Sequence, residues 1–155
     1  MKIRLATESD ISELAKLYGD AVTAIAPAYY SPEQVATWAA FSFETEAFRK
    51  FILNPTTFIA EDADKICGFS GLENDGHVVS VYVHPDYFRQ GIGSRLLAAV
   101  LEEARIQKMS QLYSEASEFS KPLFDKFGFQ NYDIERVLRN GVWFDRYLML
   151  RSQSL

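Results

Sequence analysis

One segment of the chain constrains its fold more than any other: residues 78–97, VVSVYVHPDYFRQGIGSRLL. A β-branched strand is followed by a turn, a loop with two glycines, and a helix whose apolar residues recur at helical spacing. Gly91 and Gly93 have no Cβ, so the backbone there can direct several N–H groups toward one point. These amides add to the positive end of the helix dipole. The segment therefore predicts a site for a phosphate or pyrophosphate group.

The elements around this segment predict an α+β fold, with a mixed, mostly antiparallel central sheet and helices on both of its faces. Strands, recognised by alternating or β-branched patterns, are expected at 2–6, 57–61, 65–72, 77–83, 112–116, 132–138 and 142–150. Helices, whose apolar residues recur every three or four positions, are expected at 11–25, 32–39, 46–53, 92–107 and 122–127. Asn140–Gly141 is typical of a type I′ hairpin turn. No repeat or linker interrupts the chain, so one domain spanning 1–155 is expected.

Composition narrows the range of partners. The chain has 16 Lys and Arg against 21 Asp and Glu, a net charge of −5. Nucleic acids and anionic membranes require a basic surface, so neither is expected as a partner. The single Cys67 excludes an internal disulfide, and one Cys with two His argues against a metal site. Without a long apolar run or a signal-like N-terminus, a cytoplasmic protein is expected.

The glycine pair by itself fits more than one class of protein. The nucleotide P-loop, GxxxxGK[ST], does not occur in the sequence. A dinucleotide-binding enzyme remains an alternative: Leu96 stands where its fingerprint requires a third glycine, whereas Glu115 roughly meets its requirement for a later acid. That fold would need further parallel units, and the residues after 116 offer mostly a hairpin. A glycine turn that only packs a strand on a helix is the alternative without a ligand.

The segment resembles the central motif of the GCN5-related N-acetyltransferase (GNAT) superfamily, a strand followed by Q/R-x-x-G-x-G/A and a helix. Residues 88–93, FRQGIG, match both glycines, whereas Phe88 replaces the first Gln or Arg. Residues 124–129, FDKFGF, match the family's YxxxGF with Phe in place of Tyr. The order of elements also fits, so the resemblance spans essentially the whole chain. Residues 30–39 and 139–149 resemble a bacterial subgroup.

The resemblance implies acetyl-CoA as co-substrate. In this family a β-bulge separates the motif strand from the next strand, and the pantetheine arm lies in the gap like an added strand. The residues that would contact this arm by position are Val81, Tyr82, Val83, Ser117 and Phe124. The loop residues that would hold the pyrophosphate are Arg89, Gln90, Gly91, Ile92, Gly93 and Ser94.

The implied reaction is direct attack of a neutral amine on the acetyl thioester, which requires a proton acceptor and a proton donor. His77 stands where several family members have a catalytic carboxylate, and its imidazole is the candidate acceptor. Glu73 is the fallback, and a solvent-facing His77 is the alternative without function. The family's usual donor to the leaving thiolate is the tyrosine that Phe124 replaces. Tyr82 and Tyr113 are therefore the candidate donors, against ordinary strand aromatics as the alternative. A water as donor, or release of the thiolate without protonation, also remains open.

The acceptor site is expected between the first two helices, their loop and the final hairpin. Tyr29, Tyr30 and Trp143 would line it. An aromatic wall with acidic surroundings suits a small-molecule or peptide amine that carries positive charge. A CoA-binding regulatory module without turnover is a further alternative, because the usual tyrosine is missing. The resemblance also leaves a homodimer open.

Overall fold

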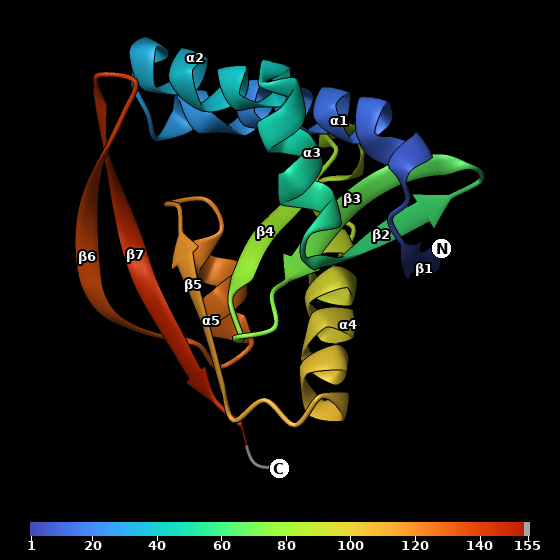
Figure 1. The fold of residues 1–155 in the computed structure, drawn as a ribbon. Helices are drawn as coiled ribbons and strands as arrows, with labels where there is room; N and C mark the ends of the chain where they lie inside the picture. The colour runs from blue at the N-terminus through green and yellow to red at the C-terminus, as the bar shows by residue number, and fades with distance from the viewer. Residues whose placement is uncertain (154–155) are drawn as a thin grey trace.

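The computed structural model describes residues 1–153, which form a mixed set of strands and α-helices (Figure 1). The strands are β1 (Lys2–Leu5), β2 (Thr56–Asp62), β3 (Lys65–Leu72), β4 (Val78–Val83), β5 (Gln111–Ala116), β6 (Gln130–Arg139) and β7 (Val142–Ser152). The α-helices are α1 (Ile11–Ile25), α2 (Pro32–Ala40), α3 (Thr45–Leu53), α4 (Ile92–Ile106) and α5 (Lys121–Lys126). Within residues 1–153, no helix is long and apolar enough to cross a bilayer.

Two antiparallel sheets meet along β4 and β5. One has the strand order β1-β2-β3-β4, and the other has the order β5-β7-β6. They touch where β4 begins: His77 and Tyr113 form a parallel bridge, and the Ser114 hydroxyl donates to the Val78 carbonyl at 2.7 Å. Beyond this contact β4 and β5 diverge toward the helices at the top of Figure 1. The expected mostly antiparallel sheet is confirmed, and this divergence creates the gap on which the site is built.

A β-bulge lies in β4 next to the point of divergence. Gly71 of β3 pairs with Ser80, whereas the next residue, Leu72, pairs with Val78, so Val79 is an extra residue in β4. The Ser80 hydroxyl accepts a hydrogen bond from the Gly71 amide at 2.9 Å and holds the strand at this point. A bulge bends its strand and increases the local twist. The bulge in the motif strand, which the family resemblance implies, is therefore present.

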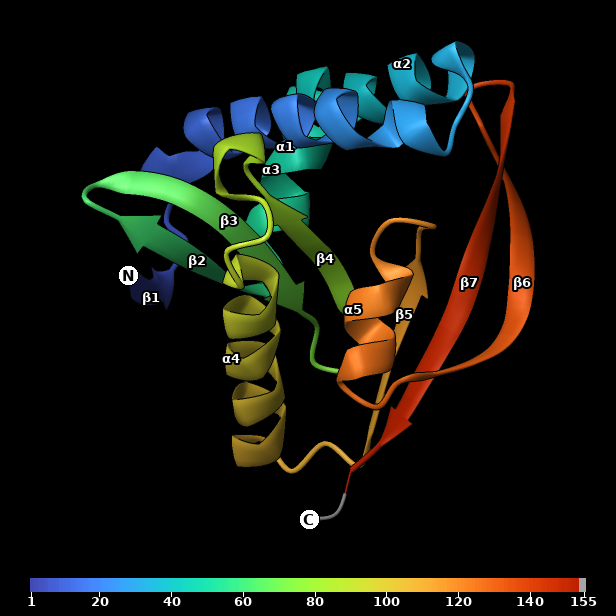
Figure 2. The ribbon, with the colours of Figure 1, turned by 180° about the vertical axis from the view of Figure 1, so that it is seen from behind.

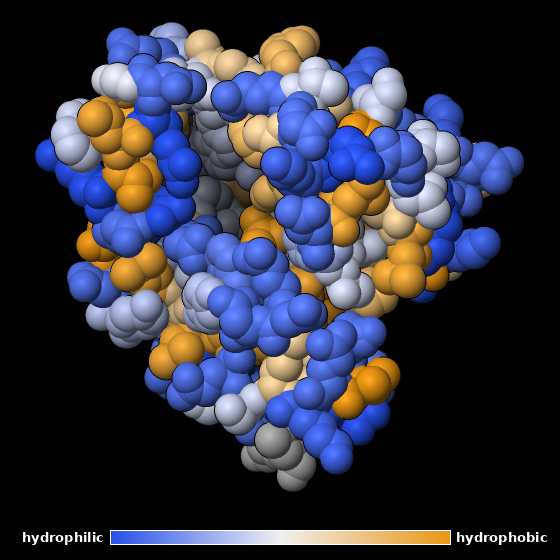
Figure 3. All heavy atoms as spheres, viewed as in Figure 1, coloured by the Kyte–Doolittle hydropathy of each residue, from blue (hydrophilic) through white to orange (hydrophobic). Residues whose placement is uncertain are grey.

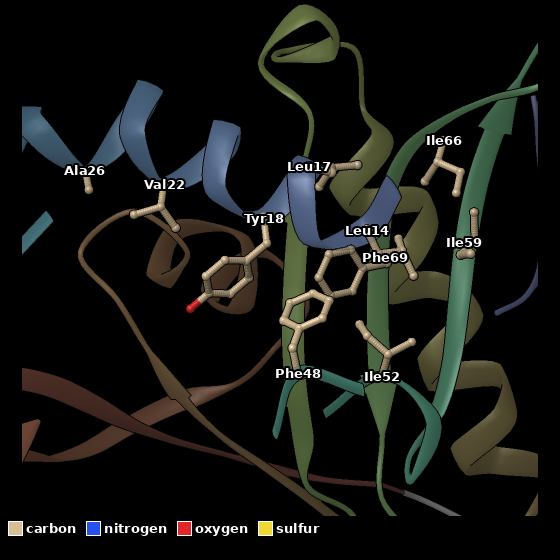
Figure 4. Packing of buried hydrophobic residues seen from close by; sticks show 10 residues of the cluster. All are labelled: Leu14, Leu17, Tyr18, Val22, Ala26, Phe48, Ile52, Ile59, Ile66 and Phe69. Atoms are coloured by element: carbon tan, nitrogen blue, oxygen red, sulfur yellow. The ribbon is translucent and has the colours of Figure 1, made fainter. Parts of the chain in front are cut away.

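Helices cover both faces of the sheets. On one face, α1 and α3 bury an apolar cluster that includes Leu14, Phe48 and Phe69 (Figure 4). On the other face, α4 packs on β2, β3 and β4, and α5 lies beside it in front of the strands in Figure 2. The second cluster there includes Leu97 and Met149. A third, smaller cluster includes Ile92 and Leu96 of α4. The prediction of helices on both faces is confirmed, and apolar clusters hold the strands from opposite sides.

Local signals in the sequence set several element boundaries. The Ser31 hydroxyl accepts from the Gln34 amide at 3.1 Å, and Pro32 takes the first position of α2, as in a capping box. Asn140 and Gly141 have φ of +48° and +80°, as a type I′ turn requires. Most element boundaries differ from the expected ones by one or two residues. One of these shifts concerns the site: β4 begins at Val78 rather than at residue 77, because His77 makes only an isolated bridge.

Candidate active site

A narrow gap separates β4 from β5 beyond the bridge. Residues 79–83 line one side of it, and Ser114 and Glu115 line the other. Within the described residues β4 is the last strand of its sheet, so its edge along the gap has no strand partner there. An extended arm with amide groups can bind such an edge as an added strand. The residues that the resemblance assigns to the pantetheine arm all line this gap: Val81, Tyr82, Val83, Ser117 and Phe124.

The loop before α4 presents backbone amides at the start of the helix. Gly91 has a φ of +77° and Arg89 a φ of +63°, so both occupy the left-handed region. The Arg95 amide donates to the Gly91 carbonyl at 3.0 Å and makes the first α-helical bond, so the amides of residues 92–94 precede the helical ladder. No protein atom lies within 4 Å of a Cβ built at Gly91. Open space in front of these amides fits a pyrophosphate group.

Polar side chains surround the loop. Gln90 donates to the Asp86 carbonyl at 3.3 Å and ties the loop to the preceding turn. Lys126 of α5 donates to the Ser94 hydroxyl at 2.9 Å and brings a positive charge to the start of α4. Sequence reasoning missed Lys126, although it lies inside the FDKFGF motif. The loop therefore joins a set of amides to at least one cation from a separate helix.

At the point where β4 and β5 meet, His77 lies between two carboxylates. Its Nδ1 is 2.8 Å from a carboxylate oxygen of Glu73, and its Nε2 is 2.9 Å from one of Glu115. The imidazole stacks on the Tyr113 ring at 4.7 Å between centroids. The His77 side chain is only 20% exposed. The solvent-facing alternative for His77 is therefore wrong.

The surroundings of His77 favour its charged form. Burial acts against the charge, but the hydrogen bonds to Glu115 and Glu73 outweigh it and raise the pKa of His77 above its ordinary value. For Glu115, burial likewise opposes ionisation, whereas His77 and Arg146 favour it, and the pKa of Glu115 is lowered. An imidazolium can donate from both ring nitrogens, which suits a carboxylate on each side. The three side chains therefore form one hydrogen-bonded group around His77.

A larger cleft, of about 910 Å³, adjoins the gap. It lies between the helices and the β6–β7 hairpin, where Figure 3 shows a hollow to the right of the hairpin. The Phe, Tyr and Trp residues of its lining are Tyr18, Tyr30, Trp38, Phe41, Phe51, Tyr82 and Phe144. Glu73 and His77 line this cleft only, whereas Tyr82 and Glu115 line both the cleft and the gap. Tyr82 and Glu115 therefore mark the junction between the two cavities.

Two of the three expected acceptor residues lie elsewhere. Tyr30 lines the cleft, but Tyr29 and Trp143 do not, and they are 58% and 49% exposed. Trp143 packs instead against Arg136, 5.0 Å from its ring centroid. The next residue, Phe144, faces the cleft because successive side chains of a strand point to opposite faces. The expected aromatic wall is present. Because side chains alternate along β7, Phe144 rather than Trp143 contributes to it.

The two tyrosines considered as proton donors have different surroundings. The Tyr82 hydroxyl accepts a hydrogen bond from the Trp38 indole at 3.3 Å, and burial raises the pKa of Tyr82, so it keeps its proton. The Tyr113 hydroxyl donates to Asp75 at 2.5 Å, and this bond raises the pKa of Tyr113 to about 12. Tyr113 lines neither cavity. Only Tyr82 is positioned where the two cavities meet.

The architecture is that of an acyl-group transferase. Two strands splay apart, an amide loop lies at one end of the gap between them, and a cleft lined by aromatic and charged side chains adjoins it. A family model described as an acetyltransferase (GNAT) domain matches residues 26–150, and the chain belongs to this family of acetyltransferases. It is 29% identical over 150 residues to the uncharacterized N-acetyltransferase YafP of Escherichia coli K12, a match that covers 96% of this chain and 94% of YafP.

Two solved structures have the same fold. A GCN5-related N-acetyltransferase from Rhodopseudomonas palustris superposes with a TM-score of 0.94 and 26% identity, covering 98% of this chain and 95% of that one. The PaiA N-acetyltransferase of Thermoplasma acidophilum, solved in complex with coenzyme A, gives a TM-score of 0.81 at 16% identity and covers 99% of this chain and 100% of its own. The dinucleotide-binding alternative is wrong, because both sheets are antiparallel and Glu115 bonds His77.

Proposed function

We propose that this chain transfers the acetyl group of acetyl-CoA to a primary amine by direct attack. The observation that carries the proposal is the continuity of the two cavities at Tyr82 and Glu115. The gap and the amide loop suit the pantetheine and pyrophosphate of acetyl-CoA, and the coenzyme A complex of the archaeal relative supports this donor. An acceptor in the cleft would then meet the thioester at the junction.

The proposed reaction makes one bond and breaks one. The amine nitrogen attacks the thioester carbonyl carbon, the C–N bond forms, and the C–S bond breaks to release the thiolate. The amine proton passes to the Glu115–His77 pair, directly or through one water. The Tyr82 hydroxyl, which keeps its proton, donates to the thiolate in place of the tyrosine that Phe124 replaces. Backbone amides of β4 near Val83 would stabilise the oxyanion.

A thermal shift followed by a turnover assay tests the proposal. Acetyl-CoA should raise the Tm and NAD(H) should not, because only the former fits an edge strand together with an amide loop. Release of the CoA thiol should then depend on an added primary amine. Stabilisation by acetyl-CoA with no amine-dependent thiol release would instead support the CoA-binding module without turnover.

A further inference from the structure

The aromatic cleft contains an arginine that its neighbours leave unpaired. Three arginines lie near the tip of the β6–β7 hairpin, and two have partners: Arg136 pairs with Asp145, and Arg146 with Glu135 and Glu115. Arg139 lines the cleft and makes no ion pair or side-chain hydrogen bond within residues 1–153. A guanidinium is a planar donor that matches a carboxylate through two parallel hydrogen bonds. Arg139 is exposed, so its guanidinium is free to bind a carboxylate that enters the cleft.

Arg139 acts on the interior of the cleft as well as on its rim. Burial raises the pKa of Tyr18, and the charge of Arg139 acts in the opposite direction on this hydroxyl. Burial and His77 have the largest effects on the pKa of Glu115. The charges of Arg146 and Arg139 add smaller effects, and both lower this pKa. Figure 4 shows the Tyr18 hydroxyl directed away from the apolar cluster, and Tyr18 lines the cleft. The Arg139 guanidinium is thus close enough to interact electrostatically with the Tyr18 hydroxyl and with the Glu115 carboxylate.

The carboxylates of the cleft do not leave it with a surplus of negative charge. Glu73 and Glu115 share the imidazolium of His77, and Asp145 pairs with Arg136. Arg146 also lines the cleft and pairs with Glu135 and Glu115, and the other two lining charges, Glu44 and Lys50, are of opposite sign. The expected acidic side chains are therefore present, but most of them have a basic partner. Arg139 and Lys50 are the cations of the lining that make no ion pair within residues 1–153, and of the two only Arg139 offers a planar guanidinium.

We infer that the acceptor carries a carboxylate as well as its primary amine, and that Arg139 binds this carboxylate while the amine faces Glu115 and His77. This inference rests on the proposed transfer to an amine and names its substrate class. The aromatic lining adds a preference for an apolar side chain, because rings bury such groups favourably. The acceptor class is thus an apolar amino acid, or a short peptide with a free carboxylate.

A matched set of acceptors tests the inference. L-phenylalanine, phenylalanine amide and 2-phenylethylamine share the ring and the amine, but only the first has a carboxylate. We expect kcat/KM for phenylalanine to exceed that for the other two by about 10–100-fold, the range of one or two charge-assisted hydrogen bonds. Arg139→Gln should bring the three acceptors to similar values. The dipeptide Gly-Phe, with its amine farther from the carboxylate, separates a free amino acid from a peptide.

The control is Arg105→Gln, which removes the same kind of side chain from the exposed face of α4, outside the cleft lining. It should preserve the preference for phenylalanine. Equal kcat/KM for phenylalanine and its amide in the wild type would overturn the inference. So would a preference for phenylalanine that survives Arg139→Gln. A preference that disappears in Lys50→Gln, the other cation of the cleft lining, would also overturn it. Binding of N-acetylphenylalanine and N-acetylphenylethylamine in the presence of CoA gives the same comparison without turnover. Absence of thiol release with every amine would contradict the proposed transfer, while these affinities would still decide the carboxylate preference.

Discussion

Nε2 of His77 lies 2.9 Å from Oε1 of Glu115, although the two residues are 38 positions apart in the sequence. The contact joins the residue before β4 to a residue near the end of β5, close to the point where the two sheets separate. Because Glu115 also faces the gap, this pair connects the cleft proposed for the acceptor with the gap proposed for the thioester. The group proposed to accept the amine proton thus lies where the two sheets diverge.

The pKa of His77 should control the pH dependence of turnover. The bracketing carboxylates raise this pKa, so His77 stays charged to a higher pH than an ordinary histidine. The hydrogen-bonded group around His77 accepts a proton only after His77 has lost its own, so kcat/KM should rise with pH through a midpoint above ~6.5, the unperturbed value. Glu73→Gln removes one carboxylate and should move the midpoint to lower pH.

Two measurements check this pH dependence. Profiles of kcat/KM against pH give the midpoint in activity. NMR titration of the imidazoles gives the pKa of His77 itself, and a His84→Asn variant assigns the two histidine signals. A midpoint that is the same in the wild type and in Glu73→Gln would show that His77 does not govern the proton transfer.

Glu115→Gln should reduce turnover more than it affects co-substrate binding. The amide keeps the size of the side chain but cannot accept a proton, so kcat should fall by about 10²-fold or more. Steady-state kinetics and titration with acetyl-CoA measure the two effects. Glu102→Gln, which breaks an exposed pair with Arg105 on α4, should change neither. Retention of kcat within a few-fold in Glu115→Gln would assign the proton to another acceptor.

Two glycines with the same backbone conformation allow a matched test of the amide loop. Gly91 and Gly141 have φ of +77° and +80°, and no protein atom lies within 4 Å of a Cβ built at either. Alanine at each position should lower the free energy of unfolding by a similar amount, about 1 kcal/mol. Only Gly91→Ala should weaken acetyl-CoA binding, by about tenfold or more, since its methyl group enters the space in front of the amides. Equal affinities in the two variants would remove the loop from the binding site.

Tyr82→Phe should lower kcat by about 10²-fold if its hydroxyl protonates the thiolate. Phe124 stands where the family usually has the donor tyrosine. Its side chain is 3% exposed, lines the same gap and packs edge-to-face on Phe129. Phe124→Tyr in the Tyr82→Phe background should therefore restore part of the lost kcat with little change in KM, because the donor acts only in the transition state. A double variant that loses stability and gains no rate would contradict this assignment.

A buried ion pair near the N-terminus predicts sensitivity to acid. Two hydrogen bonds from the Arg4 guanidinium, each 2.9 Å long, hold the pKa of Asp10 at about 2. Because this pKa is below that of the unfolded chain, the pair stabilises the fold at neutral pH, and the stabilisation is lost as pH falls from about 4 toward 2. Asp10→Asn should lower the free energy of unfolding at pH 7 by about 2 kcal/mol. Asp20→Asn, which breaks an exposed pair with Lys16, should change it by less than ~1 kcal/mol in denaturant titrations.

The sequence by itself determined the order of the elements, the amide loop and the hairpin turn. Each of these depends on short-range requirements: apolar spacing for α4, a residue without Cβ at Gly91, and positive φ at Asn140 and Gly141. A helix expected over 92–107 accordingly runs from Ile92 to Ile106. The family motifs in the same stretch located the gap, because they lie on elements that are contiguous in the chain.

Only the tertiary structure decided which side chains face the cleft. Glu115 reaches His77 because β4 and β5 touch at one point and then separate, and no local pattern specifies that contact. Strand parity places Phe144 in the cleft and Trp143 outside, and a shift of one residue would have exchanged them. Arg139 has no ion pair within residues 1–153, whereas Arg136 and Arg146 on the same hairpin pair with Asp145 and Glu135. Register and the divergence of two sheets are long-range properties, so these residues acquire their roles only when the chain has folded.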